Sequence, residues 1–379
     1  MKRSYKTLMI MPYLPLEGLI KFDGLSLWSY KKLSTKLITD VALRGHIDRL
    51  MACYQLYKGS QIQNPALVTT DFVNFPNPTR ATIAKIEVLK NIMLFLGILE
   101  NNSWSFITSD NFEVFYQRFN VGDDGLATQG GAIHRILSGG YKIGEIAFVK
   151  PEYINLPMGF HPDGAIYKAL SDCTVNSVKS KDKSRVIQAL NPLFAAYRNS
   201  HEQTWQSRIL LLVMAFELLF GETERKNFRK NIQKFSRLGE RTPLKTYKYP
   251  IINTETGKTM AEEQLTLNQI WAEEFYKLRH KIIHGNTVFS DDFIFRDLIK
   301  AVKPREPHFY IAVNFLVVCV LNKLREIGFS DVEHYIINPD APKVFGGKII
   351  SGIKDELFKI ESLSFYEALT RATTSSATT

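Results

Sequence analysis

The sequence predicts an α+β protein, in which an N-terminal mixed α/β domain is followed by an all-α helical bundle. Residues 1–150 contain short segments rich in strand-forming residues and bounded by Gly, Pro or Asn. Residues 179–330 show apolar residues at helical spacing instead. The chain has 379 residues and a hydrophobic fraction of 45%, so it is long enough for two domains with substantial cores.

Six extended segments and one helix are expected in the N-terminal domain. The helix is Thr79–Glu100, and the extended segments are Thr7–Met11, Leu19–Trp28, Ala66–Phe75, Trp104–Phe106, Asn111–Phe119 and Lys142–Val149. No catalytic constellation stands out here, which leaves the domain a sensing or restraining role. Its aromatic residues fit either a recognition surface or an ordinary sheet core, and the core is favoured because aromatic residues are good strand formers.

A connection and a helical domain are expected next. Residues 151–178 are rich in Pro and Gly, so they are interpreted as the connection. Five helices are predicted in the helical domain, at Val186–Tyr197, Gln203–Phe220, Glu224–Leu238, Leu265–His284 and Phe309–Ile327. Residues 331–379 form a C-terminal extension, which is expected to end in a disordered, low-complexity tail.

Several features predict a cytoplasmic protein that does not enter a membrane. The three cysteines, Cys53, Cys173 and Cys319, form no CxxC pair and are expected to be free thiols in a reducing cytosol. The N-terminal apolar run is too short for a signal peptide. The richest apolar stretches, Ile209–Phe220 and Phe309–Leu321, are shorter than the roughly 20 residues that a membrane span needs.

The stretch from Trp271 to Gly285 carries the strongest functional signal. On a helix its large apolar side chains fall within a band of roughly 60°, which predicts a core stripe; they are Trp271, Phe275, Leu278 and Ile282. A second face collects a guanidinium, two imidazoles and two apolar groups, which are Arg279, His280, His284, Tyr276 and Ile283. Gly285 is expected to end the helix.

This second face has the chemistry of a phosphate site. Arginine binds phosphate oxygens through its planar fork of N–H groups. Histidine gives or takes a proton near neutral pH. The apolar pair Tyr276 and Ile283 lies beside these groups and would be costly to leave in water, so we expect a second copy of the chain to cover it.

The string Arg279-His280-x-x-x-His284, followed by Gly285, resembles the Arg-polar-x3-His motif of the HEPN ribonuclease superfamily. The surrounding wording, from Phe275 to Gly285, is closest to its ApeA-like branch, as is the upstream helix from Arg208 to Gly221. The resemblance covers about residues 180–330. It implies a HEPN helical bundle, a metal-independent endoribonuclease and a homodimer that brings two motifs together. It also implies a bacterial role in antiviral defence by abortive infection, or as a toxin, with host RNA, such as tRNA, as the target.

Roles for the motif residues follow from the resemblance. His284 would act as general base or acid, and Arg279 would hold the phosphate and stabilise charge on phosphorus. His280 would position the phosphate or the ribose. RNA supplies its own nucleophile, the 2′-hydroxyl, so the expected products carry a 2′,3′-cyclic phosphate and a 5′-hydroxyl. Glu217, a carboxylate in an apolar helix, needs a basic partner; it either orients Arg279 or a histidine, or has a purely structural partner.

A basic segment precedes the motif helix. Of the net charge of +10, which is 48 basic minus 38 acidic residues, nine Lys or Arg and one Glu (+8) lie in residues 225–248. On a helix its main cations share one face; they are Lys226, Lys230, Lys234, Arg237 and Arg241. This face predicts a track for an RNA backbone, against the plainer interpretation of a solvated helix surface.

Other functions have weaker support. A non-catalytic HEPN module, which dimerises, binds RNA or senses a phage component, is the main alternative. A toxin modified by a partner nucleotidyltransferase is a third interpretation, but that subfamily has Tyr where Asn286 stands. His280 and His284 have the spacing of a metal pair but lack a third ligand nearby, so no metal is expected. No cofactor is expected either, because phosphate- and dinucleotide-binding motifs are missing from the sequence.

Overall fold

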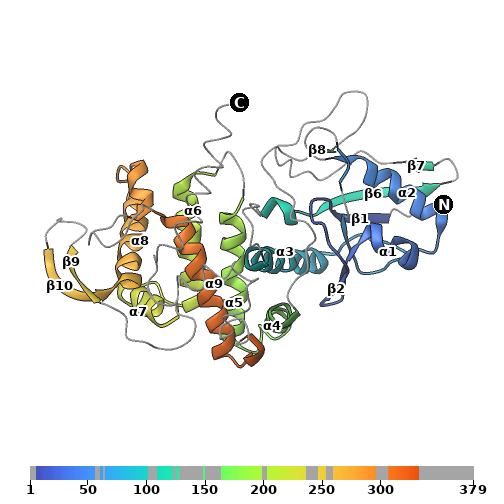
Figure 1. Cartoon of the computed structure of the whole chain (residues 1–379). Helices are drawn as coiled ribbons and strands as arrows, with labels where there is room; N and C mark the ends of the chain where they lie inside the picture. The colour runs from blue at the N-terminus through green and yellow to red at the C-terminus, as the bar shows by residue number, and fades with distance from the viewer. Residues whose placement is uncertain are drawn as a thin grey trace. The chain divides into compact units, whose positions relative to one another are not determined.

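The structure of the protein is a computed structural model. It describes residues 6–55, 60–62, 65–100, 109–122, 125–127, 148–149, 164–198, 203–235, 246–252, 259–295 and 306–332. The expected segment Trp104–Phe106, most of Lys142–Val149 and nearly all of the C-terminal extension lie outside these residues. The contacts divide the chain into two compact units, each of which is described by itself (Figure 1). Unit 1 comprises Met1–Ile98, Ser105–Tyr167 and Tyr197–Glu202, and unit 2 comprises Leu99–Trp104, Lys168–Ala196 and Gln203–Thr379.

Unit 1 is built on an antiparallel sheet. Its strand order is β2-β3-β5-β1-β6-β7. These strands are β1 (Lys6–Met11), β2 (Leu19–Phe22), β3 (Leu25–Ser29), β5 (Ala66–Thr69), β6 (Phe115–Gly122) and β7 (Gly125–Ala127). The central strand β1 places Met9 opposite Val68 on one side and Tyr116 on the other. A separate short pair joins β4 (Tyr54–Gln55) to β8 (Phe148–Val149) in parallel.

The expected single segment Leu19–Trp28 is instead a hairpin. Asp23 and Gly24 both have positive φ, at 42° and 80°, between β2 and β3. An Asp-Gly pair with positive φ at both positions makes the tight turn that matches the twist of paired strands. The dipeptide was therefore the sequence signal that separates the two strands.

Unit 1 also holds more helix than expected. The helix α3 (Arg80–Glu100) agrees with the prediction, but α1 (Tyr30–Leu37) and α2 (Val41–Ala52) replace residues that were not assigned to any helix. The N-terminus of α2 is capped by Asp40, whose side chain accepts a hydrogen bond from the backbone N–H of Leu43. Several large aromatic side chains are core residues, as the favoured interpretation held; Phe22, Trp28 and Phe75 are each at most 1% exposed. Phe72, Phe115 and Tyr116 are only half-buried.

Unit 2 is a group of helices arranged around α6. Its helices are α4 (Gly164–Val175), α5 (Lys181–Ala196), α6 (Trp205–Phe220), α7 (Arg225–Phe235), α8 (Leu267–Ile283) and α9 (His308–Glu326). Four of them, α5, α7, α8 and α9, contact α6, which places α6 at the centre of the unit (Figure 1). The helix α4 falls inside the segment 151–178 that was interpreted as a connection.

Unit 2 is not all-α, and this part of the prediction was wrong. The strands β9 (Thr246–Ile252) and β10 (Thr259–Thr266) form an antiparallel hairpin directly before α8. A shorter pair joins β11 (Ile294–Phe295) to β12 (Glu306–Pro307), and single 3₁₀ turns lie at Ser290–Phe293 and Ser330–Val332. A further 3₁₀ turn, Ser109–Phe112, belongs to unit 1. The β9 segment is rich in Tyr, Ile and Thr, which favour strands. The mixed α+β class of the whole chain is confirmed.

Two features were tested in the structure: whether α9 could span a membrane, and whether the cysteines are free. By length and apolar composition α9 could cross a membrane, with a mean hydropathy of 1.3 over its most apolar window, but 72% of that window is buried inside the structure. This burial is what the core helix of a soluble domain shows. Cys53, Cys173 and Cys319 are free thiols, as expected, and burial raises the pKa of Cys173 to about 12.

Candidate functional site

The motif helix α8 ends where the sequence predicts. His284 is its C-terminal cap residue, and Gly285 adopts the left-handed conformation with φ of 66°. The backbone N–H of Gly285 bonds to the carbonyl of Ile282, and that of Asn286 bonds to the carbonyl of Lys281 at 3.0 Å. This pair of bonds satisfies the last carbonyls of the helix and suits glycine, which has no Cβ to clash. The motif histidine is thereby held at the last turn.

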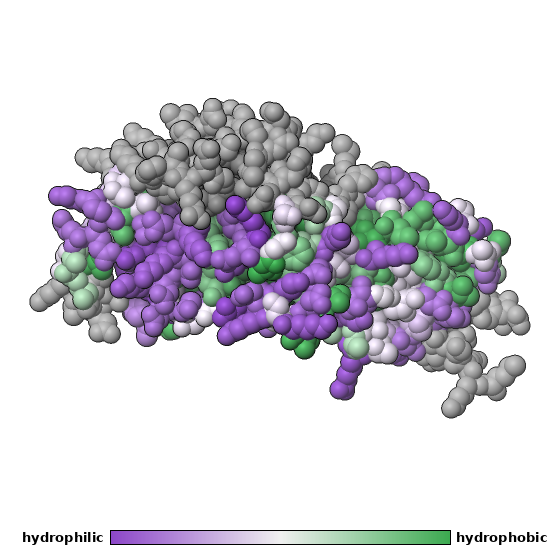
Figure 2. All heavy atoms as spheres, turned by 90° about the horizontal axis from the view of Figure 1, so that it is seen from below, coloured by the Kyte–Doolittle hydropathy of each residue, from purple (hydrophilic) through white to green (hydrophobic). Residues whose placement is uncertain are grey.

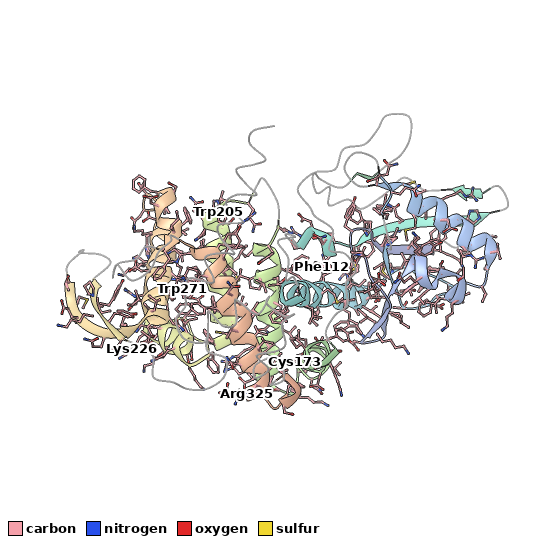
Figure 3. The ribbon with its side chains drawn as sticks, in the orientation of Figure 1. Phe112, Cys173, Trp205, Lys226, Trp271 and Arg325 are labelled. Atoms are coloured by element: carbon pink, nitrogen blue, oxygen red, sulfur yellow. The ribbon has the colours of Figure 1, made fainter. Side chains whose placement is uncertain are left out.

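The core stripe of α8 is confirmed for three of its four members. Trp271, Phe275 and Leu278 are at most 3% exposed, whereas Ile282 is only half-buried. The indole of Trp271 stacks on the ring of Phe275, with centroids 4.8 Å apart, and contacts Phe315 of α9 at 4.7 Å. Figure 3 places Trp271 between α8 and α9. These contacts fix the rotation of α8 about its axis, and so fix the face that it turns away from the core.

Arg279 is paired with Glu217 across α8 and α6. The Nη2 atom of Arg279 lies 3.3 Å from Oε1 of Glu217, and their side chains are 27% and 17% exposed. The guanidinium also lies over the ring of Tyr276, 5.0 Å from its centroid. The sequence left the partner of Glu217 open, and this ion pair places Glu217 where it orients Arg279.

Tyr276 holds Glu217 from the other side. Its hydroxyl donates a hydrogen bond either to Oε1 of Glu217, at 3.2 Å, or to the backbone carbonyl of Thr223. Burial raises the pKa of the Tyr276 hydroxyl, so the group stays protonated and can donate. Thr223 was not singled out from the sequence, because a backbone acceptor in a loop leaves no side-chain signal.

The two imidazoles lie together at the exposed end of the helix. The ring centroids of His280 and His284 are 4.1 Å apart, with planes tilted by 44°. His284 is exposed and His280 is half-buried. At the exposed cap position, His284 can reach a ligand in solvent. The structure thus brings the two histidines together and leaves the outer one accessible.

Of the two apolar residues expected at a dimer contact, Tyr276 is buried and Ile283 is exposed. Tyr276 is only 8% exposed because Phe228 of α7 packs on its ring, with centroids 5.5 Å apart. It therefore offers little surface to a second chain, contrary to its predicted place in an interface. Ile283 is 50% exposed and Phe289, a few residues on, is 66% exposed. The apolar surface at this end of α8 is therefore made by Ile283 and Phe289.

The basic segment forms the amphipathic helix α7. Phe228, Ile232 and Phe235 are buried, and Lys226, Lys230 and Lys234 are exposed, as expected for opposite faces. Figure 3 labels Lys226 at α7, in whose first turn it lies. Hydrophilic residues dominate the part of the surface over α7 in Figure 2. The predicted RNA contacts Arg237 and Arg241 lie outside the described residues, and Lys234 forms an ion pair with Glu326 at 2.8 Å.

Two other cations of the same segment point inward. Arg225 and Arg229 both pair with Glu273 of α8, which is 3% exposed. Arg229 also reaches Glu263 of β10 at 2.7 Å. A buried carboxylate requires such partners, because an isolated charge is costly to remove from water. These arginines therefore attach α7 to α8, and Glu273 is a structural residue that the sequence pattern did not reveal.

The site was also compared with metal-binding geometry and with known proteins. Within the ranges described above, no three His, Cys, Asp or Glu side chains come together in a way that could hold a metal ion. Comparisons of the chain with protein-family models, with curated proteins and with solved structures find no match.

Proposed function

We propose that the chain is a metal-independent endoribonuclease of the HEPN type. The observation that carries the proposal is the pairing of Arg279 with Glu217 on α8, five residues before the exposed His284 that caps the same helix. An arginine and an accessible histidine at one end of a helix supply what RNA cleavage needs, because the substrate brings its own nucleophile. The enzyme has only to align the 2′-hydroxyl, move protons and stabilise charge on phosphorus.

Each motif residue has a step in this reaction. His284 takes the proton from the 2′-hydroxyl or gives one to the leaving 5′-oxygen, and water makes the other of these two proton transfers. The 2′-oxygen then bonds to phosphorus as the bond to the 5′-oxygen breaks, which leaves a 2′,3′-cyclic phosphate and a 5′-hydroxyl. Arg279 donates hydrogen bonds to the phosphate oxygens while charge gathers on them. His280, at 4.1 Å from the ring of His284, positions the phosphate or the ribose.

Glu217 supports Arg279 without touching the substrate. Its carboxylate contacts one edge of the guanidinium, which carries five N–H donors in a planar fork. The edge turned from Glu217 is the one that a phosphate would use. Because the side chains of the pair are only partly exposed, the contact is expected to hold the guanidinium in one orientation.

The partners follow from the same proposal. The substrate is RNA, with host tRNA as one candidate, and the active form is a homodimer in the cytoplasm of a bacterium. A phage-derived trigger or a regulatory partner protein would control cleavage, in the manner of an abortive-infection system or a toxin. Unit 1 would then sense that trigger or restrain unit 2.

The first prediction concerns catalysis. Arg279→Ala and His284→Ala should each lower the rate of RNA cleavage by a factor of about 100 or more, because each removes a group that acts in the transition state. The measurement is cleavage of total RNA and of purified tRNA, with the products analysed for cyclic phosphate ends. Lys281→Ala, on the same turn and in an exposed ion pair with Asp292, is the matched control and should keep full activity.

Two outcomes would remove this assignment. Full cleavage by a folded His284→Ala protein would show that another group moves the proton. Loss of cleavage in excess chelator, restored by a divalent ion, would instead give His280 and His284 a role as metal ligands.

RNA binding without cleavage by the wild-type chain is the signature of the main alternative. In that case the protein is a non-catalytic HEPN module that dimerises, binds RNA or senses a phage component. The exposed lysines of α7 are the feature that favours this alternative, since they can serve binding with no help from His284.

A further inference from the structure

A groove of about 660 Å³ lies between α5 and α6 in unit 2. One wall is the loop after α4 with the first turns of α5, and the other is the C-terminal half of α6. A volume of this size is ample for a small ligand or a short segment of a polymer. The sequence does not reveal this groove, because one wall comes from a basic run and the other from an apolar helix, and each pattern is ordinary when seen alone.

The first wall is strongly basic. Lys179, Lys181 and Arg185 line it together with the hydrogen-bonding side chains of Ser177, Ser184 and Gln188. Within the described part of the chain, neither Lys179 nor Lys181 forms an ion pair with a carboxylate. Among the described residues, Arg185 makes a long contact with the exposed carboxylate of Asp182, at 3.5 Å. The groove therefore presents positive charge that the protein itself leaves largely uncompensated.

Arg185 is held in the groove by the end of α6. Its guanidinium lies so close to Gly221 that a Cβ built on this glycine would be 2.0 Å from Nη2. Gly221 also has a left-handed φ of 67°, which a glycine adopts without strain. The absence of a side chain at position 221 thus lets the guanidinium of Arg185 rest against the second wall.

The second wall carries two apolar side chains and reaches the candidate active site. Met214 and Leu218 line it, and Met214 is 47% exposed. Glu217 and Thr223 line it as well. These are the two residues whose oxygens contact Tyr276, and Glu217 also contacts Arg279. The groove and the phosphate site of α8 therefore share Glu217 as a common wall.

We propose that this groove binds the backbone of a single-stranded RNA segment next to the phosphate that is cleaved. Lys179, Lys181 and Arg185 contact phosphates, and sugars or bases lie on the apolar surface of Met214 and Leu218. A positively charged groove that follows the backbone is a general feature of single-strand binding sites. The inference rests on the proposed ribonuclease function, because it uses Arg279 as the point to which the strand leads.

The test compares RNA affinity and its salt dependence in matched variants. A short fluorescent single-stranded RNA is titrated with the full-length chain in a His284→Ala background, so that cleavage does not interfere. In the double variant Lys179→Gln/Lys181→Gln the salt slope of log K should become less steep by about 1.4, because each single-strand phosphate contact contributes about 0.7. Affinity near 0.1 M salt should fall about tenfold or more.

Matched variants separate this site from general surface charge. Lys31→Gln/Lys36→Gln removes the same charge from exposed positions of α1 and should leave binding unchanged. Met214→Glu adds a carboxylate to the groove at a half-exposed position, so it should weaken RNA binding while the protein stays folded. A polyglutamate peptide serves as a second probe and should bind much more weakly than RNA.

The outcomes distinguish failure of the groove proposal from failure of the proposed ribonuclease function. Unchanged affinity and slope in the lysine variant would overturn the groove proposal, even if the wild type cleaves RNA. Equal binding of polyglutamate and RNA would overturn it as well, and would indicate a site for an acidic protein. If the wild type does not cleave RNA but the lysine and Met214 variants lose RNA binding, the ribonuclease function fails and the groove remains an RNA site.

Discussion

His308, at the start of α9, is a buried histidine outside the motif. It is 3% exposed, and the rings of Trp271, Phe275 and Phe295 surround it at centroid distances of 5.7 to 6.4 Å. Burial lowers its pKa from 6.5 to about 4, although the charges of Glu274 and Asp292 act in the opposite direction. The imidazole is therefore neutral in the folded protein at neutral pH and takes part in the core.

The stability of unit 2 should fall as the pH drops below about 6.5. The unfolded chain binds a proton at His308 near pH 6.5, and the folded chain does so only near pH 4. The folded state is thus fully stable above the unfolded pKa and loses about 3 kcal/mol once the pH is below both values. Urea unfolding at about pH 7.5 and about pH 5 measures the loss. In His308→Leu the difference between the two pH values should shrink by about 2 kcal/mol; an equal difference in both proteins would contradict this assignment.

At the scale of the element, α7 divides its cations between two tasks. Arg225 and Arg229 face inward and neutralise Glu273, while Lys226 and Lys230 face solvent. The segment is uniformly basic in the sequence, but in the fold Arg225 and Arg229 attach α7 to α8. Among the described cations of α7, Lys226 and Lys230 are the stronger candidates for RNA contact, since Lys234 is engaged with Glu326.

Reversing the outer charges should weaken RNA binding without harming the fold. Lys226→Glu/Lys230→Glu leaves the buried Phe228, Ile232 and Phe235 untouched, so the melting temperature should hardly move. The salt slope should fall by about 1.4, the contribution of two single-strand phosphate contacts. Lys31→Glu/Lys36→Glu on α1 is the charge-matched control. Unchanged affinity in the α7 variant would make this face a solvated surface only.

The rotation and end of α8 could be predicted from its sequence because both are local. The spacing of Trp271, Phe275 and Leu278 defines one buried face, and Gly285 supplies the left-handed residue that ends the helix. The burial of Tyr276 could not be predicted in this way. Its position on a helical wheel says nothing of Phe228, which arrives from α7 and covers it.

Other parts of the fold depend on pairing between distant or ambiguous segments. In the β9–β10 hairpin, apolar and polar residues alternate only weakly along the sequence. These segments become strands because each pairs with the other. The groove between α5 and α6 forms where Arg185 comes close to Gly221, which lies 36 positions later in the chain. Tertiary packing, rather than local preference, determines both features, so periodicity alone could not reveal them.

At the scale of the whole molecule, the site of a single chain is open to solvent. His284 is exposed. Ile283 and Phe289, which are near it in the sequence, also expose their apolar side chains to water. Two chains joined through this end of α8 would bury that apolar surface and bring together a second Arg279 and His284. The charges of the site would then act in a lower dielectric, where they stabilise a transition state more strongly.

Ile283→Asp should therefore convert the protein from a dimer to a monomer and abolish cleavage. The residue is 50% exposed and lies outside the buried stripe of α8, so the helical circular dichroism should not change. Light scattering should report a mass that falls from twice to once the 43.4 kDa of the chain. Met260→Asp, at a 69% exposed apolar position on β10, is the matched control and should remain dimeric and active. A wild type that is monomeric and fully active at nanomolar concentration would show that one chain completes the site, and that Ile283 and Phe289 serve another contact.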